Sequence, residues 1–482
     1  MPKIGTAGTV HVSIVRRLRP DGSRYVQEVR SVYDPKIKNN KVLSSKTLGI
    51  LPAGETDLSK LQPVPRKRKS SMNEQPASSG RPEAIREIAG KMEDSRVSYL
   101  VIYPLDLVLL VILLAGLAGY TSDYQISEYW KVHRAFFKMW FDDFPDRDIS
   151  HDTVRRIIKL IGKDQSQKLI SRFTDPLVSS FARRIVNVDG QALRAAISQE
   201  HQDHSRYILN LYDSDNEVCL QQILIEEKHN EITEAINIIK DQNLTGALLT
   251  CDAMNTQKEL ARVLIEEKHC DYCFALKRNH KHLHELVCGC FEARSAAPIV
   301  KHAEAKDLGH GREEVREISV LPASVLNEHF SDELAEWAGL EHGCLVKART
   351  IRRGSKRSGQ DSDETRYFIS SLHFDETYIA QTLARVIRRH WCIENNLHWV
   401  LDVTYGQDRK QCRNADYLTG RTALNKVIFN LTSKAQCLIE KETGKDAPTK
   451  SVMKVRFSSP ESTLKLLADV LAAARQTESG QP

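Results

Sequence analysis

The sequence predicts an α/β protein, because apolar segments of strand length alternate with segments of helical periodicity. Two of the strand-like segments, residues 184–188 and 247–251, each stop abruptly at an aspartate, Asp189 and Asp252. Both segments are expected to be buried strands that deliver a carboxylate to the edge of a sheet. Each aspartate alone is more typical of a solvated strand end, so the inference depends on what accompanies the pair.

Glu394 accompanies the two aspartates from a helical stretch near the core. It lies beside an apolar stripe at helical spacing, formed by Ile393, Leu397 and Val400. Three carboxylates brought together repel one another unless a cation compensates, and Mg²⁺ prefers oxygen ligands. A pair of such ions can activate an attacking oxygen and stabilise a leaving one, which indicates phosphoryl transfer.

The segments around these acids resemble one known family. The matching segments, in chain order, are VDGQALR (188–194), EKHNEI (227–232), LTCDAMNTQ (249–257), DYCFALK (271–277), GHGREEVR (309–316) and HWCIENNLHWVLDVT (390–404). They resemble the DDE transposases of bacterial insertion sequences, specifically the H-repeat-associated group. The resemblance extends over residues 86–435, and its last segment is the most specific.

The resemblance implies a ribonuclease-H-like catalytic core in which Asp189, Asp252 and Glu394 are the catalytic and metal-binding residues. It also implies Mg²⁺ as the cofactor, with Mn²⁺ as a substitute, and double-stranded DNA as the partner, at the element ends and at the target. A homo-oligomer is expected on DNA. The family usually has lysine where Gln191 stands, and a related branch has arginine where His390 stands. The route of cleavage, through a DNA hairpin or otherwise, is therefore left open.

The chain is too long for one core, so several structural units are expected. The predicted units are a small β-rich N-terminal domain (1–61), a flexible basic linker (62–85), a helical N-terminal domain (86–182), the first part of the catalytic core (183–294), a β-rich insertion (295–375), the second part of the core with the Glu394 helix (376–440) and a C-terminal tail with a helix (441–482). Within the core, strands at 207–213, 218–226 and 272–277 and helices at 231–241, 258–268 and 283–293 are predicted. The insertion is expected to hold strands at 314–320, 344–351 and 367–371.

Two basic groups are candidates for DNA contacts. The first lies in the insertion and the second precedes Glu394; they comprise Arg349, Arg352, Arg353, Lys356 and Arg357, and then Arg388, Arg389 and His390. Phosphate contacts by such residues would give affinity that depends on salt and not on base sequence. A solvated hairpin remains the alternative for the insertion. Trp391 and Trp399 are expected in the core, with base stacking as the alternative.

A Cys/His constellation competes for a metal, because Cys270 and Cys273 are followed by His280, His282, His284, Cys288 and Cys290. The first two cysteines enter a predicted buried strand, where small thiols suit an apolar context. Structural cysteines are therefore favoured over zinc. The ten cysteines lack regular spacing and no signal peptide is evident, which favours reduced thiols in the cytoplasm.

The apolar run 107–119 is too short to span a membrane, and a buried helix is expected there. A net charge of +6 is modest for this length and does not by itself indicate nucleic-acid binding. The sequence thus predicts a transposase that binds the terminal inverted repeats of its element, cuts the DNA and joins strands. The alternatives are a non-catalytic DNA-binding descendant of such an enzyme and a general metal-dependent nuclease.

Overall fold

The computed structural model describes residues 10–18, 24–34, 39–52, 54, 56–60, 83–179, 183–197, 205–225, 231–277, 280–293, 299–309, 312–326, 334–353, 361–409 and 412–479. The chain divides into two compact units, Met1–Ala77 and Ser78–Pro482. Residues 61–82, which include most of the predicted linker, lie outside the described residues.

The first unit is a three-stranded antiparallel sheet in the order β1-β2-β3. Its strands are β1 (Val10–Leu18), β2 (Arg24–Asp34) and β3 (Asn39–Leu51). Among its described side chains, Val12 and Ile14 are exposed, whereas Val26 and Leu51 are buried.

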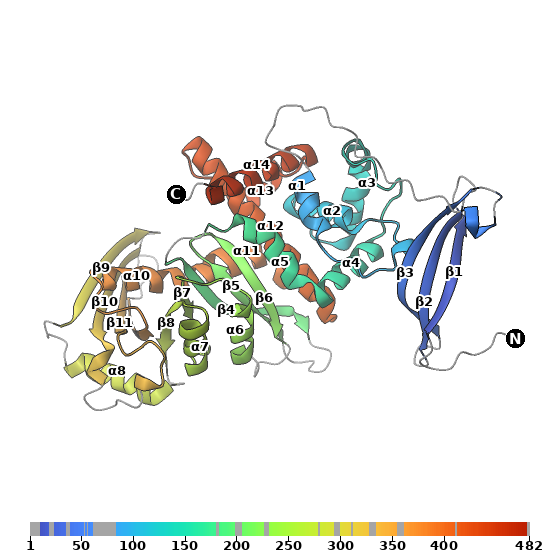
Figure 1. Ribbon diagram of the computed structural model, residues 1–482. Helices are drawn as coiled ribbons and strands as arrows, with labels where there is room; N and C mark the ends of the chain where they lie inside the picture. Colours follow the sequence, from blue (N-terminus) through green and yellow to red (C-terminus); the bar gives the residue numbers. More distant parts are fainter. Residues whose placement is uncertain are drawn as a thin grey trace. The chain divides into compact units, whose positions relative to one another are not determined.

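The second unit contains a nine-stranded sheet in the order β6-β5-β4-β7-β8-β12-β11-β10-β9 (Figure 1). Its first five strands are β4 (Ile185–Ile197), β5 (Ser205–Asp213), β6 (Val218–Ile225), β7 (Leu248–Cys251) and β8 (Asp271–Leu276). β4, β5 and β6 are antiparallel neighbours, whereas β7 pairs parallel with both β4 and β8. These strands confirm the predicted ones, with one correction. β4 does not stop at Asp189 but continues for several residues, because β5 pairs with it beyond that point.

The remaining four strands extend this sheet. They are β9 (Lys301–Gly309), β10 (Arg312–Pro322), β11 (Cys344–Arg353) and β12 (Ser362–Ser370). β12 pairs antiparallel with β8, from Tyr367 opposite Leu276 to Ser370 opposite Cys273. The predicted insertion therefore continues the sheet of the core, and its first strand, β9, was missed because few of its residues are apolar.

Helices cover both faces of the large sheet. Val186 and Val188 point to a core shared with α6 (Glu231–Lys240), α7 (Lys258–Arg262) and α8 (Lys281–Ala293). Ile185 points to the opposite face, which packs against α10 (Ile379–His390). After α10 come a π-helix (Ile393–His398) and α11 (Trp399–Val403), and this face is the one that carries the candidate site.

A helical layer packs beside the sheet and is organised around α12 (Ala415–Thr443). Its N-terminal members are α1 (Glu83–Gly90), α2 (Leu105–Leu117), α3 (Asp123–Trp140), α4 (His151–Asp164) and α5 (Ser166–Thr174). The axes of α4 and α12 approach closely at Gly162 and Gly420, where an added Cβ would meet the backbone of the other helix at 1.6 and 2.1 Å. α2 is the apolar run 107–119, and it is buried in this layer as expected.

The C-terminal segment packs on the same core. α13 (Lys450–Arg456) and α14 (Pro460–Ser479) contribute Met453, Phe457 and Leu467 to it, all essentially inaccessible to solvent. The segment is thus an integral part of the helical layer, and α12 runs across the predicted boundary at residue 440. No helix among the described residues has the length and apolar character needed to cross a membrane.

Candidate active site

Asp189 and Asp252 are brought to adjacent positions by the pairing of β4 with β7. Val188 is in register with Cys251 in this parallel pair, and each aspartate is the next residue in its chain. Neighbouring strands lie about 4.8 Å apart, and paired positions of parallel strands present their side chains on the same face. The pairing of the two aspartates that the sequence predicts is therefore found in the backbone.

A chain of hydrogen bonds fixes α10 on the aspartate face. Asn187 Nδ2 donates to Thr250 Oγ1 at 2.7 Å, and Thr250 Oγ1 lies 2.9 Å from His390 Nδ1. The Thr250 hydroxyl can donate to this nitrogen or accept from it, according to the tautomer of the imidazole. Burial lowers the pKa of His390 to about 4, against the opposing effect of Asp252, so this imidazole is neutral. Its hydrogen bond with Thr250 ties the end of α10 to β7.

Asp252 is held by the turn that follows β7. Its Oδ1 accepts from the backbone N and from Nδ2 of Asn255, at 3.2 and 3.1 Å, while the Thr256 hydroxyl donates to its carbonyl oxygen. Within the described part of the chain, Oδ2 of Asp252 has no hydrogen-bond partner. The turn thus fixes the carboxylate through one oxygen and leaves the other for a ligand.

Glu394 meets Asp189 as the sequence predicts, and His398 joins them. Ligand atoms of Asp189, Glu394 and His398 all lie within 4.8 Å of one another. Asp189 is half-buried, Glu394 exposed and His398 buried. Asp252 is not a member of this group, although its strand is the neighbour of β4. The described residues therefore bring together two of the three predicted acids within metal-ligand distances and place the third on the adjacent strand.

His398 is the functional candidate that sequence reasoning missed. It follows Glu394 by four residues on the π-helix, and its Nδ1 lies 3.7 Å from Asp189 Oδ2. On the other side of the ring, Nε2 lies 3.0 Å from Nδ2 of Asn210, which is opposite Asp189 in the β4–β5 pair. Burial, with a further effect from Lys426, lowers the pKa of His398 to about 3. The i, i+4 spacing from Glu394 was the available signal.

Several buried polar side chains lie around the candidate site and form hydrogen bonds with one another. Gln191 Nε2 donates to Asp402 Oδ1 at 2.8 Å, and Gln191 Oε1 accepts from Gln407 Nε2 at 3.1 Å. Burial raises the pKa of Asp402, a change that the Gln191 hydrogen bond opposes. Lys426 on α12 is inaccessible, and its Nζ has no hydrogen-bond partner among the described residues. Desolvation lowers the pKa of Lys426 to about 8, with Cys219 and Asp402 acting against it.

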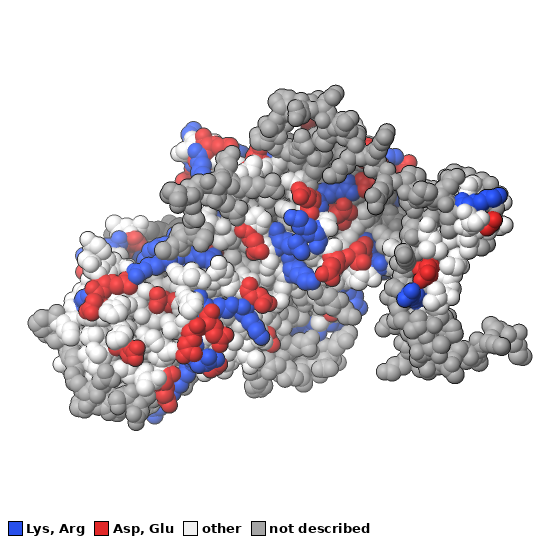
Figure 2. All heavy atoms as spheres, viewed as in Figure 1, with Lys and Arg blue, Asp and Glu red and all other residues white. Residues whose placement is uncertain are grey.

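The basic residues of the insertion lie in ion pairs. Arg349 contacts Asp363 at 2.6 Å and Glu317 at 3.4 Å across the sheet, and Arg352 lies 3.6 Å from both Glu314 and Glu364. Arg353 pairs with Glu313 at 3.5 Å. Lys356 and Arg357 lie outside the described residues. On the face drawn in Figure 2, acidic and basic side chains of the described residues are intermixed, with no single basic field.

The basic residues at the end of α10 differ in their protein partners. Arg389 donates to the carbonyl oxygen of Ser214 at 3.1 Å, which anchors α10 to the turn between β5 and β6. His390 is occupied by Thr250, as described above. Arg388 is exposed and has no ion pair among the described residues. It is therefore the residue of this group that can meet a phosphate without giving up a protein partner.

Trp391 and Trp399 are exposed, so the expectation that they belong to the core is wrong. Their exposed fractions are 38% and 59%, because each lies two residues from the apolar stripe, at Ile393 or Leu397, and so on the outer side of the helix. The Arg366 guanidinium lies 4.8 Å from the centre of the Trp391 ring. Trp391, Asn395 and Arg388 line one side of a 670 Å³ cavity whose other side includes Arg349 and Arg352.

The Cys/His constellation does not converge. Cys270 belongs to the core on the α6–α8 face, whereas Cys273 belongs to the core on the α10 face. His280 Nε2 lies 2.6 Å from the carbonyl oxygen of Thr256, and His284 lies 3.7 Å from Cys288 Sγ. Alternation along β8 thus puts the two cysteines on opposite sides of the sheet, where one ion cannot bind both.

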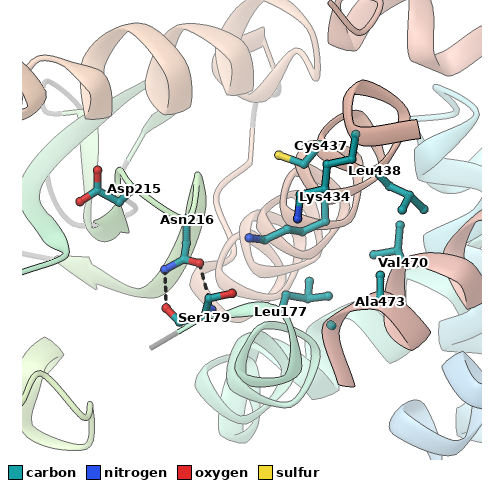
Figure 3. Close-up of a pocket in the computed structure, with 11 residues that line it drawn as sticks. Leu177, Ser179, Asp215, Asn216, Lys434, Cys437, Leu438, Val470 and Ala473 are labelled. Carbon is teal, nitrogen blue, oxygen red and sulfur yellow. Dashed lines mark hydrogen bonds between the residues drawn. The ribbon is translucent and has the colours of Figure 1, made fainter. Parts of the chain in front are cut away.

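A second hollow, of 280 Å³, lies between α12, α14 and the turn after β5 (Figure 3). Its wall is largely apolar, with Leu177, Leu438 and Val470, and its basic members are Lys434 and Lys441. Asn216 exchanges hydrogen bonds with the backbone of Ser179 and is thereby satisfied. This hollow holds no group of three metal-ligating side chains among the described residues, so the carboxylate site is elsewhere.

Two family models match the chain. The transposase DDE domain matches residues 180–431, and a domain associated with it matches residues 87–174. The first match includes Asp189, Asp252 and Glu394 as well as the whole nine-stranded sheet.

Curated relatives agree with this match. The Escherichia coli K12 protein named "H repeat-associated putative transposase YhhI" is 26% identical over 344 residues, which cover 70% of this chain and 87% of the relative. The Escherichia coli O157:H7 protein named "Putative transposase YncI" is 27% identical over 329 residues, or 67% of this chain and 80% of the relative. The paired aspartates, the facing glutamate and a domain match over more than half of the chain lead to one assignment: this protein belongs to the DDE-domain transposase family.

Proposed function

We propose that this transposase binds the terminal inverted repeats of its own element, cleaves the DNA at their ends and joins the released 3′-hydroxyl to target DNA. The observation that carries the proposal is the meeting of Glu394 with Asp189 above the paired strands β4 and β7, the second of which leads directly into Asp252. The order and directions of β6, β5, β4, β7 and β8 support a ribonuclease-H-like core for this half of the sheet.

The residues present fit a divalent metal ion. Two carboxylates and a neutral imidazole offer ligand atoms within 4.8 Å of one another, and donors of these types suit a divalent cation. Glu394 in particular has no ion pair in the described part of the chain, although it faces another carboxylate. Like charges at this separation destabilise a site that has no cation. Asp189, Asp252 and Glu394 would hold Mg²⁺, or Mn²⁺ in its place.

When bound, a divalent ion would supply a Lewis acid that polarises a phosphoryl oxygen and activates water. The chain's own residues prepare the site for it. Gly190 N donates to Asp189 Oδ1 at 2.9 Å and Asn255 holds Asp252, so neither carboxylate has to be ordered when substrate arrives. The Asn187–Thr250–His390 chain fixes the end of α10, and Glu394 lies on the π-helix that follows it. Such preorganisation lowers the cost of reaching an in-line geometry.

The 670 Å³ cavity beside Glu394 is the proposed path of a DNA strand. Its lining includes Trp391, exposed Arg388 and Asn395, and Asn395 is the residue after Glu394. Arginine binds phosphate through a planar pair of N–H donors, and an exposed indole can stack on a base. Arg349, Arg352 and Arg353 would contribute only by exchanging their present acidic partners for phosphates. A homo-oligomer on the paired element ends is part of the proposal.

The test uses the purified chain with labelled DNA that carries the element ends. Wild-type protein with Mg²⁺ or Mn²⁺ should give end cleavage and strand-joined products, whereas Asp189→Asn, Asp252→Asn and Glu394→Gln should each give neither and still bind the DNA. Exposed Glu341, which lies near His342, supplies a matched control in Glu341→Gln, and this variant should be fully active. Cleavage without end specificity or strand joining would instead identify a general nuclease, and binding without cleavage would identify a non-catalytic descendant.

A further inference from the structure

The group formed by Asp189, Glu394 and His398 differs from a set of carboxylates alone, because one of its three donors is nitrogen. We propose that His398 Nδ1 is a ligand of the metal ion held by Asp189 and Glu394, and that Asn210 positions the imidazole for it. The proposal deepens the proposed function and rests on it for the identity of the reaction. It concerns the chemistry of the ion site, which can be measured without DNA.

The distances suit one ion. In six-coordinate Mg²⁺ or Mn²⁺ sites with bonds of about 2.1 Å, neighbouring donor atoms are about 3 Å apart and opposite ones about 4.2 Å apart. His398 Nδ1 lies 3.7 Å from Asp189 Oδ2, and all three donors lie within 4.8 Å. A contact of 3.7 Å is too long for a hydrogen bond between the imidazole and the carboxylate. The pair is therefore spaced as two ligands of a common ion are, and small side-chain movements close the site.

Asn210 gives the imidazole a fixed orientation. It is completely buried on β5, directly opposite Asp189, and its amide lies 3.0 Å from His398 Nε2. Rotation of the Asn210 side-chain amide by half a turn places its oxygen, instead of its nitrogen, next to His398 Nε2. With nitrogen there, Nε2 accepts and Nδ1 carries the proton. With oxygen there, Nε2–H donates and Nδ1 presents a lone pair toward Asp189 and Glu394.

The amide of Asn210 has the capacity for this exchange, because its Oδ1 has no hydrogen-bond partner among the described residues. Metal-bound histidines commonly donate their second ring N–H to an oxygen, and loss of such a partner lowers metal affinity. Asn210 is thus a positioning residue whose oxygen selects the ligating tautomer. His398 is held further by the π-helix, which places Glu394 and His398 over the same part of the sheet.

A nitrogen donor predicts a preference among metals. Mg²⁺ prefers oxygen ligands and binds imidazole weakly, whereas Mn²⁺ accepts an imidazole ligand more readily. The protein should therefore bind Mn²⁺ more tightly than Mg²⁺, and His398→Gln should reduce that difference by removing the nitrogen while keeping a polar side chain.

The experiment is pulsed electron paramagnetic resonance on the full chain with Mn²⁺ and no DNA. Wild-type protein should show the ¹⁴N modulation of a directly bound nitrogen, and labelling of histidine with ¹⁵N should replace that pattern without any substitution. His398→Gln should abolish it, and His390→Gln should retain it, since that imidazole is bonded to Thr250. Asn210→Leu should weaken Mn²⁺ binding about 10- to 100-fold, and Asn210→Asp should restore it, because its carboxylate also accepts from Nε2–H.

The outcomes separate the two proposals. Bound Mn²⁺ without nitrogen modulation in wild-type protein, or a histidine-labelling experiment that leaves the pattern unchanged, overturns the role of His398 and leaves transposition by the carboxylates intact. Failure to bind Mn²⁺ at all overturns it as well. A nitrogen-ligated ion in a protein that does not cleave element ends sustains the role of His398 and overturns the proposed function.

Discussion

The strands that carry the candidate site and the strands β10–β12 belong to one sheet, yet their charged side chains have different surroundings. On β10–β12, Arg349, Arg352 and Arg353 each lie against acidic partners on neighbouring strands. At the site, Asp189 faces another acid, Glu394, and Asp252 follows on the adjacent strand. Paired charges at the surface contribute little and need no ligand, whereas acids gathered together favour a cation. The comparison teaches that the densest basic cluster in the sequence lies on strands where the charges are paired, whereas the fold gathers acids of like charge at the candidate site.

The clearest test of this difference is to substitute one acidic residue in each region and to compare the rates of strand cleavage. Asp252→Asn should lower the rate of strand cleavage by at least about a thousand-fold, because it removes a ligand charge while preserving volume. Asp363→Asn, which removes one of the two acidic partners of Arg349, should leave the rate within about two-fold of wild type, since a solvent-screened pair contributes little. Single-turnover cleavage of labelled element ends measures both. Equal losses in the two variants would remove the distinction between the regions.

Lys426 is a third kind of charged residue in this comparison. It is buried, and its Nζ has no hydrogen-bond partner among the described residues. Burial lowers the pKa of Lys426 from 10.5 to about 8. The loss of folding stability caused by burying its charged ammonium is therefore fully present below pH 8. Between pH 8 and 10.5 the unfolded chain binds more protons at this residue than the folded one, and the cost falls as pH rises. Lys426→Met should therefore raise the free energy of unfolding by on the order of 3 kcal/mol at neutral pH.

Denaturant unfolding of both proteins across pH measures this effect. The gain of Lys426→Met over wild type should shrink above pH 8 and be absent near pH 10.5. A gain that is constant with pH would mean that the methionine acts through packing alone. Leu431→Met, also on α12 and fully buried, controls for a methionine in the same helix.

Binding of a metal ion to the folded protein should raise its free energy of unfolding, and tighter binding should raise it more. At a free Mn²⁺ concentration of about 100 times the dissociation constant, the folded state gains about 2.7 kcal/mol. The melting temperature of wild-type protein should rise accordingly, and that of Glu394→Gln should rise much less at the same concentration. Without metal, Glu394→Gln should melt no lower than wild type, because it relieves repulsion with Asp189. A metal-free variant that is clearly less stable would show that Glu394 has a structural partner.

Much of the fold followed from the sequence, since β4 to β8 and α6 to α8 are strongly periodic and end at turn residues. The pairing of Asp189 with Asp252 followed from the same pattern. Other features depend on packing between distant segments. The exposure of Trp391 and Trp399 is an exception, because helical spacing already places them opposite Ile393 and Leu397. The ion pairs of Arg349 and Arg352 depend on the register of β10, β11 and β12, which the composition of each strand does not contain.

The role of His398 was missed for a related reason. The i, i+4 spacing put it near Glu394, but its partner Asn210 lies on β5, far away in sequence and opposite Asp189 only through strand pairing. A histidine between apolar residues is more often a satisfied core residue than a ligand. Its proximity to two acids became visible only when the helix and the sheet were placed together.

The smallest predicted effect concerns the arginines that flank the proposed DNA path. Arg388 is exposed without an ion pair among the described residues, whereas Arg353 pairs with Glu313. Each phosphate contact contributes about 0.9 to the slope of log affinity against log salt on duplex DNA. Arg388→Ala should therefore flatten that slope by about one unit for any DNA sequence, and Arg353→Ala by clearly less, because bound phosphate would have to displace Glu313. Fluorescence anisotropy with element-end and unrelated duplexes over a series of salt concentrations measures both slopes. Equal flattening by the two substitutions would show that the acidic partners do not restrain the insertion, and an unchanged slope in Arg388→Ala would place the DNA away from this cavity.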